Sequence, residues 1–238
     1  MADNTCWISD NTPLVFGSAG PAGATTNATL RFTCQNDGPA VRTFRVCLYM
    51  NPDDPTGVSP RRMIHYGSGN HLNYDAYSDP AMTQLIGSTT SGHATYSTTL
   101  TTNATGASSG TMPIYARIPA AQNVTAGDYA GHVTDIMRTI TQSGSGTPTV
   151  AQCATAPATS SNYTFASANF ANACYVSTAT DLNFGSATNL STERNQTSTI
   201  SLRCPNNTNW RVALNYGANA TGTTRRMIGP GSSYITYQ

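Results

Sequence analysis

One motif occurs twice in this chain, at an offset of 168 residues. Cys6 opens the run C-W-I-S, which continues to L-V-F-G-S-A at residues 14–19. Cys174 opens C-Y-V-S, which continues to L-N-F-G-S-A at residues 182–187. Three further matches follow in the same order, namely residues 30–34 with 200–204, 61–64 with 225–228, and 72–74 with 235–237. A repeat of this length indicates two related domains rather than a solenoid of short repeats.

The cysteines follow this repeat. The chain has six of them, and no two form a C-x-x-C pair, which argues against zinc and against a redox dithiol. Equivalent cysteines should pair equivalently, which predicts the disulfides Cys6–Cys34 and Cys174–Cys204. Cys47 and Cys153 remain, both in the first copy, and pair by elimination. Structural disulfides of this kind indicate an exported protein.

Short runs of alternating apolar and polar residues recur along the chain, at residues 30–34, 43–48, 112–118 and 129–140. Clusters of Gly, Pro, Asn and Asp separate them, as expected for turns. The run at 129–140 alternates less cleanly, which indicates either a bulge or a strand with two buried faces. No stretch has a helical period, so the pattern predicts an all-β fold of immunoglobulin-like sandwich type.

Charge is scarce in this sequence. Charged residues make up 10% of it, the net charge is +1, and lysine is absent. A nucleic-acid groove needs a stripe of basic residues, which two arginine pairs do not provide. The sequence contains no run of about 18 apolar residues, so it does not predict a membrane-spanning helix. The first residues lack the basic and apolar regions of a signal peptide, so we interpret the sequence as a mature exported form.

The second copy contains fewer predicted strands than the first. Gln238 aligns with Asp75, whereas the first copy continues through predicted strands at residues 111–119 and 128–141. A sandwich without these strands has an open edge and an unfilled core. We therefore expect an incomplete second domain, as in a fragment, a truncated gene product or an expressed piece, and we expect it to be unstable alone.

The order C-x-V, L-x-F-G, C, R-M and I-T-Y in the second copy, with G-D-Y at residues 127–129 of the first, resembles the spore coat protein U domain family. That family includes subunits of archaic chaperone–usher pili. The resemblance implies two immunoglobulin-like β-sandwich (pilin-type) domains, the second incomplete. It also implies a periplasmic chaperone, an outer-membrane usher and an adjacent pilus subunit as partners. The neighbouring subunit would complete the sandwich by β-strand addition, that is, donor-strand complementation.

Two features resemble the two-domain tip adhesin of this family rather than its one-domain rod subunits. The chain has two copies, and only five residues precede Cys6, too few for a donor segment. The implied organisation is an N-terminal adhesive head at residues 1–166, a linker at 167–173 and a truncated C-terminal pilin domain at 174–238. A tip head must close its own sandwich, and we predict that residues 161–165 supply the closing strand.

Loops at one pole of such a head are expected to face outward, at residues 36–41, within 87–110 and at 142–152. Tip adhesins of the family present hydrophobic loops to apolar abiotic surfaces, and apolar loop tips can bury area without a shaped pocket. The resemblance therefore implies a protein secreted through the periplasm to the pilus tip on the cell surface. There it would attach bacteria to abiotic or host surfaces and support biofilm formation. The candidate contact residues are Pro39, Ala40, Val41, Leu85, Ile86 and Val150.

Other functions find less support in the residues. A glycan-binding lectin head on the same scaffold and a structural coat or matrix protein stay open as alternatives. The four histidines have no metal-ligand spacing, and one glutamate with no nucleophile elbow gives no basis for an enzyme. We predict neither a cofactor nor a metal. Trp7 and Tyr74 recur as Tyr175 and Tyr237, and we assign both to the core.

Overall fold

The computed structural model describes residues 4–53, 58–103, 105–144 and 146–238, and strands account for almost all of their regular structure. The exceptions there are two short 3-10 helices, η1 at Val150–Ala154 and η2 at Pro230–Ser232. Neither helix is long and apolar enough to cross a membrane. The all-β prediction is confirmed. The chain divides into two compact units, residues 1–208 and 209–238.

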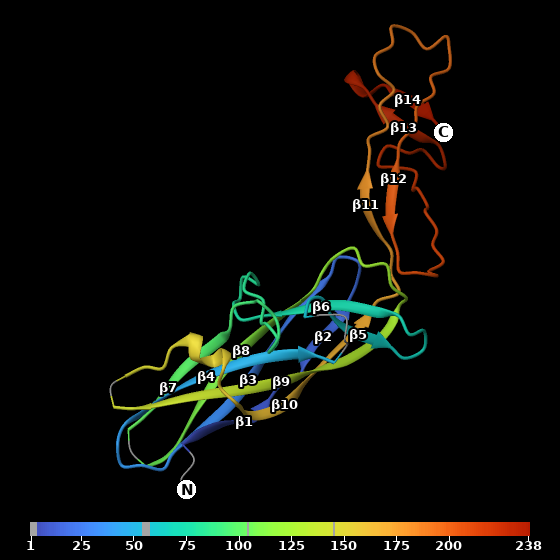
Figure 1. The fold of residues 1–238 in the computed structure, drawn as a ribbon. Coiled ribbons are helices and arrows are strands. Elements are labelled where there is room, and N and C mark those ends of the chain that lie inside the picture. The colour runs from blue at the N-terminus through green and yellow to red at the C-terminus, as the bar shows by residue number, and fades with distance from the viewer. Residues whose placement is uncertain (1–3, 54–57, 104, 145) are drawn as a thin grey trace. The chain divides into compact units, whose positions relative to one another are not determined.

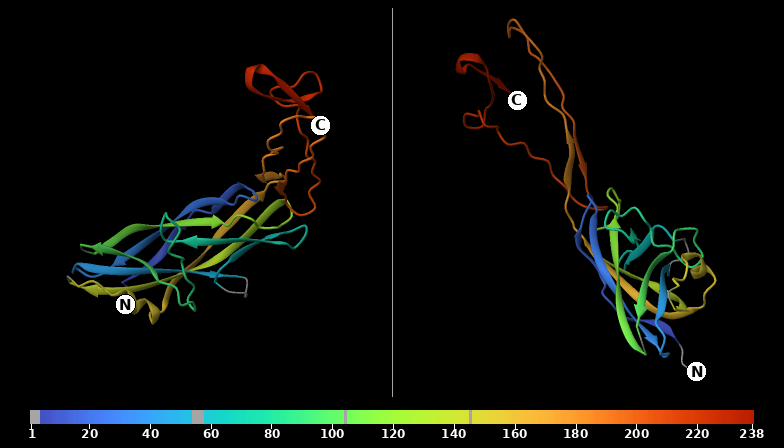
Figure 2. Two further views of the ribbon diagram at one scale, coloured as in Figure 1. Left: turned by 90° about the horizontal axis from the view of Figure 1, so that it is seen from above. Right: turned by 90° about the vertical axis from the view of Figure 1, so that its left-hand side faces the viewer.

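Residues up to Phe170 form a β-sandwich of two layers, whose strands run along its length (Figure 1, Figure 2). One layer contains, in order, β1 (Thr5–Asn11), β3 (Ala24–Asn36), β8 (Gly106–Ile118) and β6 (His71–Tyr77). The other contains β2 (Leu14–Ala19), β10 (Ala158–Phe170), β9 (Gly127–Ser143), β4 (Arg42–Pro52) and β7 (Tyr96–Thr102). The short β5 (Arg61–His65) pairs with both β6 and β9, and so joins the layers.

Alternation along the strands places one face of each layer in a shared core. Leu30 and Phe32 of β3 are buried in the same cluster as Phe44, Val46 and Leu48 of β4. Burying each such side chain contributes about 1.5–3 kcal/mol, so this core is the main source of stability in the first unit.

The strand β9 packs on both faces, fully buried on one and partly buried on the other, which explains its mixed apolar pattern. Val133 and Met137 lie in the sandwich core. On the opposite face, Ile136 and Ile140 pack against a second, smaller cluster around the Cys47–Cys153 disulfide. The sequence left open a bulge or a strand with two buried faces, and packing on both faces is the explanation that applies.

The structure contains the disulfides Cys6–Cys34, Cys47–Cys153 and Cys174–Cys204, which are the three predicted pairs. Cys6 lies opposite Cys34 in the ladder between β1 and β3. The assignment of Trp7 to the core is wrong, because Trp7 alternates with the buried Cys6 and is 39% exposed. Tyr74 is fully buried, as predicted.

The strand β10 closes the sandwich with the protein's own chain. It pairs antiparallel with β9, where Phe165 lies opposite His132, and parallel with β2, where Ala166 lies opposite Leu14. Its inward side chains are buried, namely Thr164, Ala166, Ala168 and Phe170. The predicted closing segment, residues 161–165, lies inside this strand. Because β10 extends to Phe170, residues 167–170 belong to the strand and not to a linker.

The second copy reproduces the strand register of the first. The strand β11 (Tyr175–Ala179) pairs with β12 (Ile200–Arg203) so that Val176 lies opposite Leu202, just as Ile8 lies opposite Phe32, and the same irregularity follows in both ladders. In the other unit, β13 (Arg225–Ile228) pairs with β14 (Tyr234–Tyr237) in the register of β5 and β6. The repeat is therefore a repeat of pairing as well as of sequence.

A contact between an arginine and a backbone carbonyl also recurs, buried in the first copy and exposed in the second. An Arg61 guanidinium nitrogen donates a hydrogen bond to the Met50 carbonyl oxygen at 3.0 Å. The equivalent Arg225 donates to the Leu214 carbonyl oxygen at 3.0 Å. In both copies this hydrogen bond connects the strand that carries the R-R-M-I motif, β5 or β13, to a residue eleven positions earlier in the chain. The first arginine of the motif is therefore structural.

Apolar positions that are buried in the first copy are exposed in the second. Leu14, Met50 and Leu72 are fully buried, whereas their equivalents Leu182, Leu214 and Ile235 are 38%, 66% and 44% exposed. In the described residues, the second copy has strands equivalent to β1, β3, β5 and β6. In each of the two units, the apolar positions of the second copy are thus uncovered, as expected for an incomplete sandwich.

Candidate binding surfaces

Several loops meet at one end of the first sandwich, around the turn between β3 and β4. The Thr105 hydroxyl donates a hydrogen bond to the Gly38 carbonyl oxygen at 3.1 Å, and the Gly144 N–H donates to the Val41 carbonyl oxygen at 3.0 Å. The Asp37 N–H donates to the Asn4 side chain at 3.0 Å, and Figure 1 shows the start of β1 at this end. We call the turns around Gly38, Thr105 and Gly144 the distal loops.

The turn at residues 37–41 presents three consecutive exposed residues of low polarity, Pro39, Ala40 and Val41. The buried Asn36 side chain holds it, because its amide donates to the Ala40 carbonyl oxygen at 2.9 Å and its oxygen accepts from the Gly38 N–H at 3.1 Å. Such a side-chain-to-backbone turn fixes the loop without using its apolar side chains. These side chains therefore stay free to contact another surface.

The other predicted contact residues lie elsewhere. Val150 is 42% exposed in η1, next to the disulfide that anchors this helix to β4. Leu85 is partly buried and forms an isolated bridge with Tyr77. Ile86 is a wrong candidate, because its side chain is fully buried in the core and its N–H donates to the Ala76 carbonyl oxygen at 2.9 Å. The six candidates thus do not form one surface.

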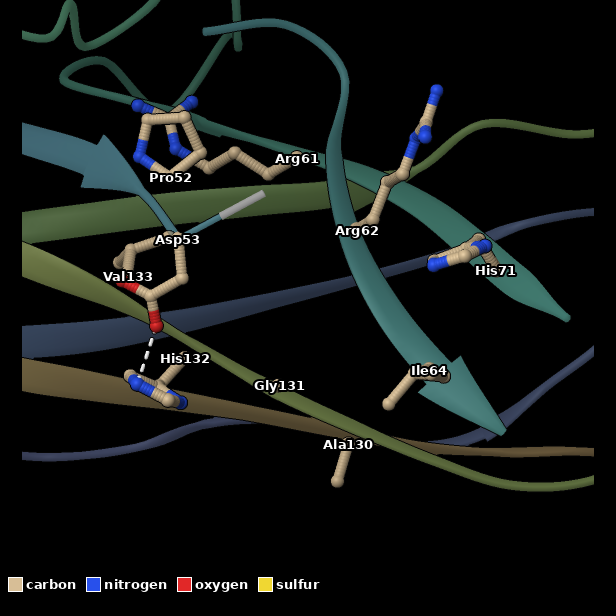
Figure 3. A pocket seen from close by; sticks show the side chains of 10 residues that line it. All are labelled: Pro52, Asp53, Arg61, Arg62, Ile64, His71, Ala130, Gly131, His132 and Val133. Carbon is tan, nitrogen blue, oxygen red and sulfur yellow. Dashed lines mark ion pairs between the residues drawn. The ribbon is translucent and has the colours of Figure 1, made fainter. Parts of the chain in front are cut away.

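A hollow of about 250 Å³ lies on the outer face of the layer that contains β4, β9 and β10, at the point where β4, β5 and β9 diverge (Figure 3). The His132 ring forms an ion pair with the Asp53 carboxylate, and the Thr134 hydroxyl donates to the same carboxylate at 3.0 Å. Arg62 and His71 also line the hollow. In the described residues, no group of three or more His, Cys, Asp or Glu side chains is placed to hold a metal ion.

Two aromatic side chains of β10 stand beside this hollow and face outward. Tyr163 is 50% exposed and Phe165 is 61% exposed, and their ring centroids lie 5.1 Å and 5.7 Å from that of His132. Neither residue is among the predicted contact residues. Alternation along the closing segment places Tyr163 and Phe165 on its outward face. A strand that only fills a core does not need aromatic side chains there, and this pattern could have indicated a contact site.

A polar network connects the closing strand to the interior. The Asp135 side chain on β9 is fully buried and accepts hydrogen bonds from the Thr164 hydroxyl at 2.6 Å and the Asn11 amide at 3.1 Å. Burial raises the pKa of Asp135 to about 7, although these hydrogen bonds and the positive charge of Arg61 oppose the shift. Asn11 also donates to the Tyr163 carbonyl oxygen at 2.7 Å, so β1, β9 and β10 are held in one register.

Comparison with protein families gives one match. A family model described as Spore Coat Protein U domain matches residues 1–135 and 145–238. No curated protein sequence matches the chain.

Comparison with solved structures gives several alignments to pilus proteins. One is the CsuC-CsuE chaperone-tip adhesion subunit pre-assembly complex from archaic chaperone-usher Csu pili of Acinetobacter baumannii. It has 14% identity, coverage of 97% of this chain and 79% of that chain, and a TM-score of 0.43. Another is CfaE, the adhesive subunit of CFA/I fimbria of enterotoxigenic Escherichia coli, with 8% identity, 69% and 48% coverage and a TM-score of 0.32. A third is self-complemented MyfA, the major subunit of Myf fimbriae from Yersinia enterocolitica, with 11% identity, 70% and 96% coverage and a TM-score of 0.27.

Proposed function

Because the chain belongs to the spore coat protein U domain family, we propose that it is a chaperone–usher pilus subunit and acts as the tip adhesin. The observation that carries this proposal is the pairing of β10 with both β2 and β9. The head supplies its own closing strand, paired on both sides, and therefore needs no strand from another subunit. A domain closed in this way can stand at the end of a fibre, where no further subunit follows.

The second copy fits the opposite role, that of a domain that accepts a strand. Its exposed apolar positions are equivalent to buried core positions of the head, so covering them with a strand of alternating apolar residues would remove a large apolar area from water. We assign this completion first to a periplasmic chaperone and then to the adjacent pilus subunit. The outer-membrane usher would exchange one for the other during secretion to the cell surface.

The distal loops are the proposed attachment site on abiotic or host surfaces, and attachment there would support biofilm formation. Pro39, Ala40 and Val41 are exposed together on a turn that the Asn36 side chain fixes from below. Apolar side chains on a rigid turn lose little conformational freedom when they are buried against a flat surface. Binding of this kind would not discriminate strongly between different apolar surfaces.

Two valines make a matched pair for testing this site. Val41 in the distal loops and Val150 in η1 are 41% and 42% exposed. We expect Val41→Ser to weaken attachment of the full chain to polystyrene by about tenfold, because one buried valine contributes about 1.5 kcal/mol. Val150→Ser should leave attachment unchanged. Equal losses in the two variants, or no loss in either, would rule out the distal loops as the contact.

A further inference from the structure

The hollow beside β10 exists because two strands leave β9 in different directions. The ladder between β4 and β9 ends with Pro52 opposite Val133, and the ladder between β5 and β9 starts with Ile64 opposite Ala130. Gly131 lies between them, and a side chain there would approach the Arg62 carbonyl oxygen to 2.9 Å. The absence of a side chain at this position lets β5 approach β9 closely, and this forms the floor of the hollow.

The size and surroundings of the hollow suit a small ring with one apolar face. Its volume of about 250 Å³ is below the roughly 300–1,000 Å³ of pockets for drug-sized ligands. Tyr163 and Phe165 do not line the hollow themselves, but they provide exposed aromatic surface next to its His132 ring, which both contact. Exposed aromatic rings on a well-formed strand are unfavourable in water and are typical of contact sites.

The polar groups of the hollow complement this neighbouring aromatic surface. The Asp53 carboxylate is fixed by His132 and Thr134, and its side chain is 37% exposed, so it can accept hydrogen bonds from ligand hydroxyl groups. Arg62 and His71 offer donors on another side. Charge-assisted hydrogen bonds of this kind are about twice as strong as neutral ones. Donors and acceptors for hydroxyl groups in the hollow thus lie next to an exposed aromatic surface on β10.

We propose that this hollow binds the terminal pyranose ring of a glycan. A pyranose has an apolar face of C–H groups, which would pack on Phe165 or Tyr163, and an edge of hydroxyl groups, which would bond Asp53, Arg62 and His71. A dry protein interface would not need the charged groups, and a nucleic acid would need a basic stripe that this surface lacks. This site is independent of the proposed attachment through the distal loops.

Comparison of the two copies supports a role beyond the scaffold. Arg62 and Ile64 recur as Arg226 and Ile228, as scaffold residues would. Asp53 and His71, in contrast, are replaced by Gly217 and Tyr234 at the equivalent positions. The proposed hydrogen-bonding groups therefore include residues that the shared scaffold does not require.

The test begins with the full chain on an array of neutral and acidic glycans. Titration calorimetry then follows with galactose, glucose, N-acetylglucosamine and N-acetylneuraminic acid. We expect a saccharide to bind, with affinity reduced about tenfold by Phe165→Ala and by Asp53→Asn. Tyr66→Ala removes an 82% exposed aromatic outside the hollow and should change affinity less than twofold.

Thermal unfolding of each variant separates a binding effect from misfolding, and little change is expected because neither side chain belongs to the buried core: Phe165 is 61% exposed and the Asp53 side chain 37%. Val41→Ser should bind the saccharide like the unmodified chain, so loss of surface attachment and loss of glycan binding remain distinguishable. Binding of no glycan on the array would overturn the proposal. Undiminished binding by both hollow variants with unchanged unfolding temperatures would also overturn it.

Discussion

Replacing Asp135 by asparagine should remove a fall in stability of the head that the unmodified protein shows as pH rises. Asp135 is fully buried, and its pKa rises from the ordinary 3.8 to about 7 because burial disfavours the charged carboxylate. A folded-state pKa above the unfolded one stabilises the protein fully below the unfolded pKa, and this stabilisation is lost as pH rises through the folded pKa. The head should therefore be most stable below about pH 4 with respect to this group, and should lose stability up to about pH 7.

The difference between the two pKa values sets the size of the effect. It corresponds to roughly 4 kcal/mol of the free energy of unfolding at neutral pH, from 1.36 kcal/mol for each pH unit. Asp75, whose pKa burial also raises, acts in the same direction, and Asp75 is unchanged in the variant. The difference between the unmodified protein and Asp135→Asn therefore isolates Asp135.

The measurement is a series of urea titrations of the full chain between pH 4 and pH 8, followed by hydrogen exchange in peptides from β9 and β10. We expect Asp135→Asn to match the unmodified protein near pH 4 and to exceed it by a few kcal/mol at pH 8. The exposed Asp10→Asn serves as the control for the exchange of a carboxylate by an amide outside the buried network. If stability rises from pH 4 to pH 7, or if Asp135→Asn keeps the same slope, burial does not control this carboxylate.

Two further predictions concern the closing strand and the second copy. Phe170→Ala should lower the free energy of unfolding of the head by about 3–5 kcal/mol in urea titrations, whereas Phe165→Ala on the same strand should change it by less than about 0.5 kcal/mol, because only Phe170 is buried. Leu214→Asp should abolish recovery of the chain in complex with a periplasmic chaperone, whereas Asn215→Asp should not; equal recovery would exclude this apolar face as the chaperone contact.

The sequence predicted the features that depend on the repeat and on alternation. The disulfide between Cys6 and Cys34 followed from its counterpart in the second copy, and the structure places these two residues opposite each other. The closing strand could be placed at residues 161–165 because the resemblance to a tip adhesin implied a head that closes its own sandwich. The first inference needed only the repeat, whereas the second also needed the family resemblance.

The sequence failed where a side chain's direction depends on its neighbours in space. Ile86 looked like an exposed loop residue, but its segment returns to the sandwich, and its carbonyl oxygen accepts a hydrogen bond from Arg61 at 2.7 Å. Trp7 matched a position of the second copy, yet period-two alternation with Cys6 directs it outward. The hollow depends on Gly131 and on two strands that end at different points of β9, which no local pattern reveals.

The pairing of β2 with β10 has a consequence for how the head acquires its structure. The partner of Leu14 is Ala166, which lies near the end of the first copy in the sequence, so this contact has a very large sequence separation. When the chain is synthesised or translocated with its N-terminus first, the edges of β2 and β9 stay unpaired until residue 170 has emerged. High contact order slows folding and prolongs such exposure. The head therefore completes its fold late in synthesis or translocation, and this interval is when it is most open to aggregation or to capture by another strand.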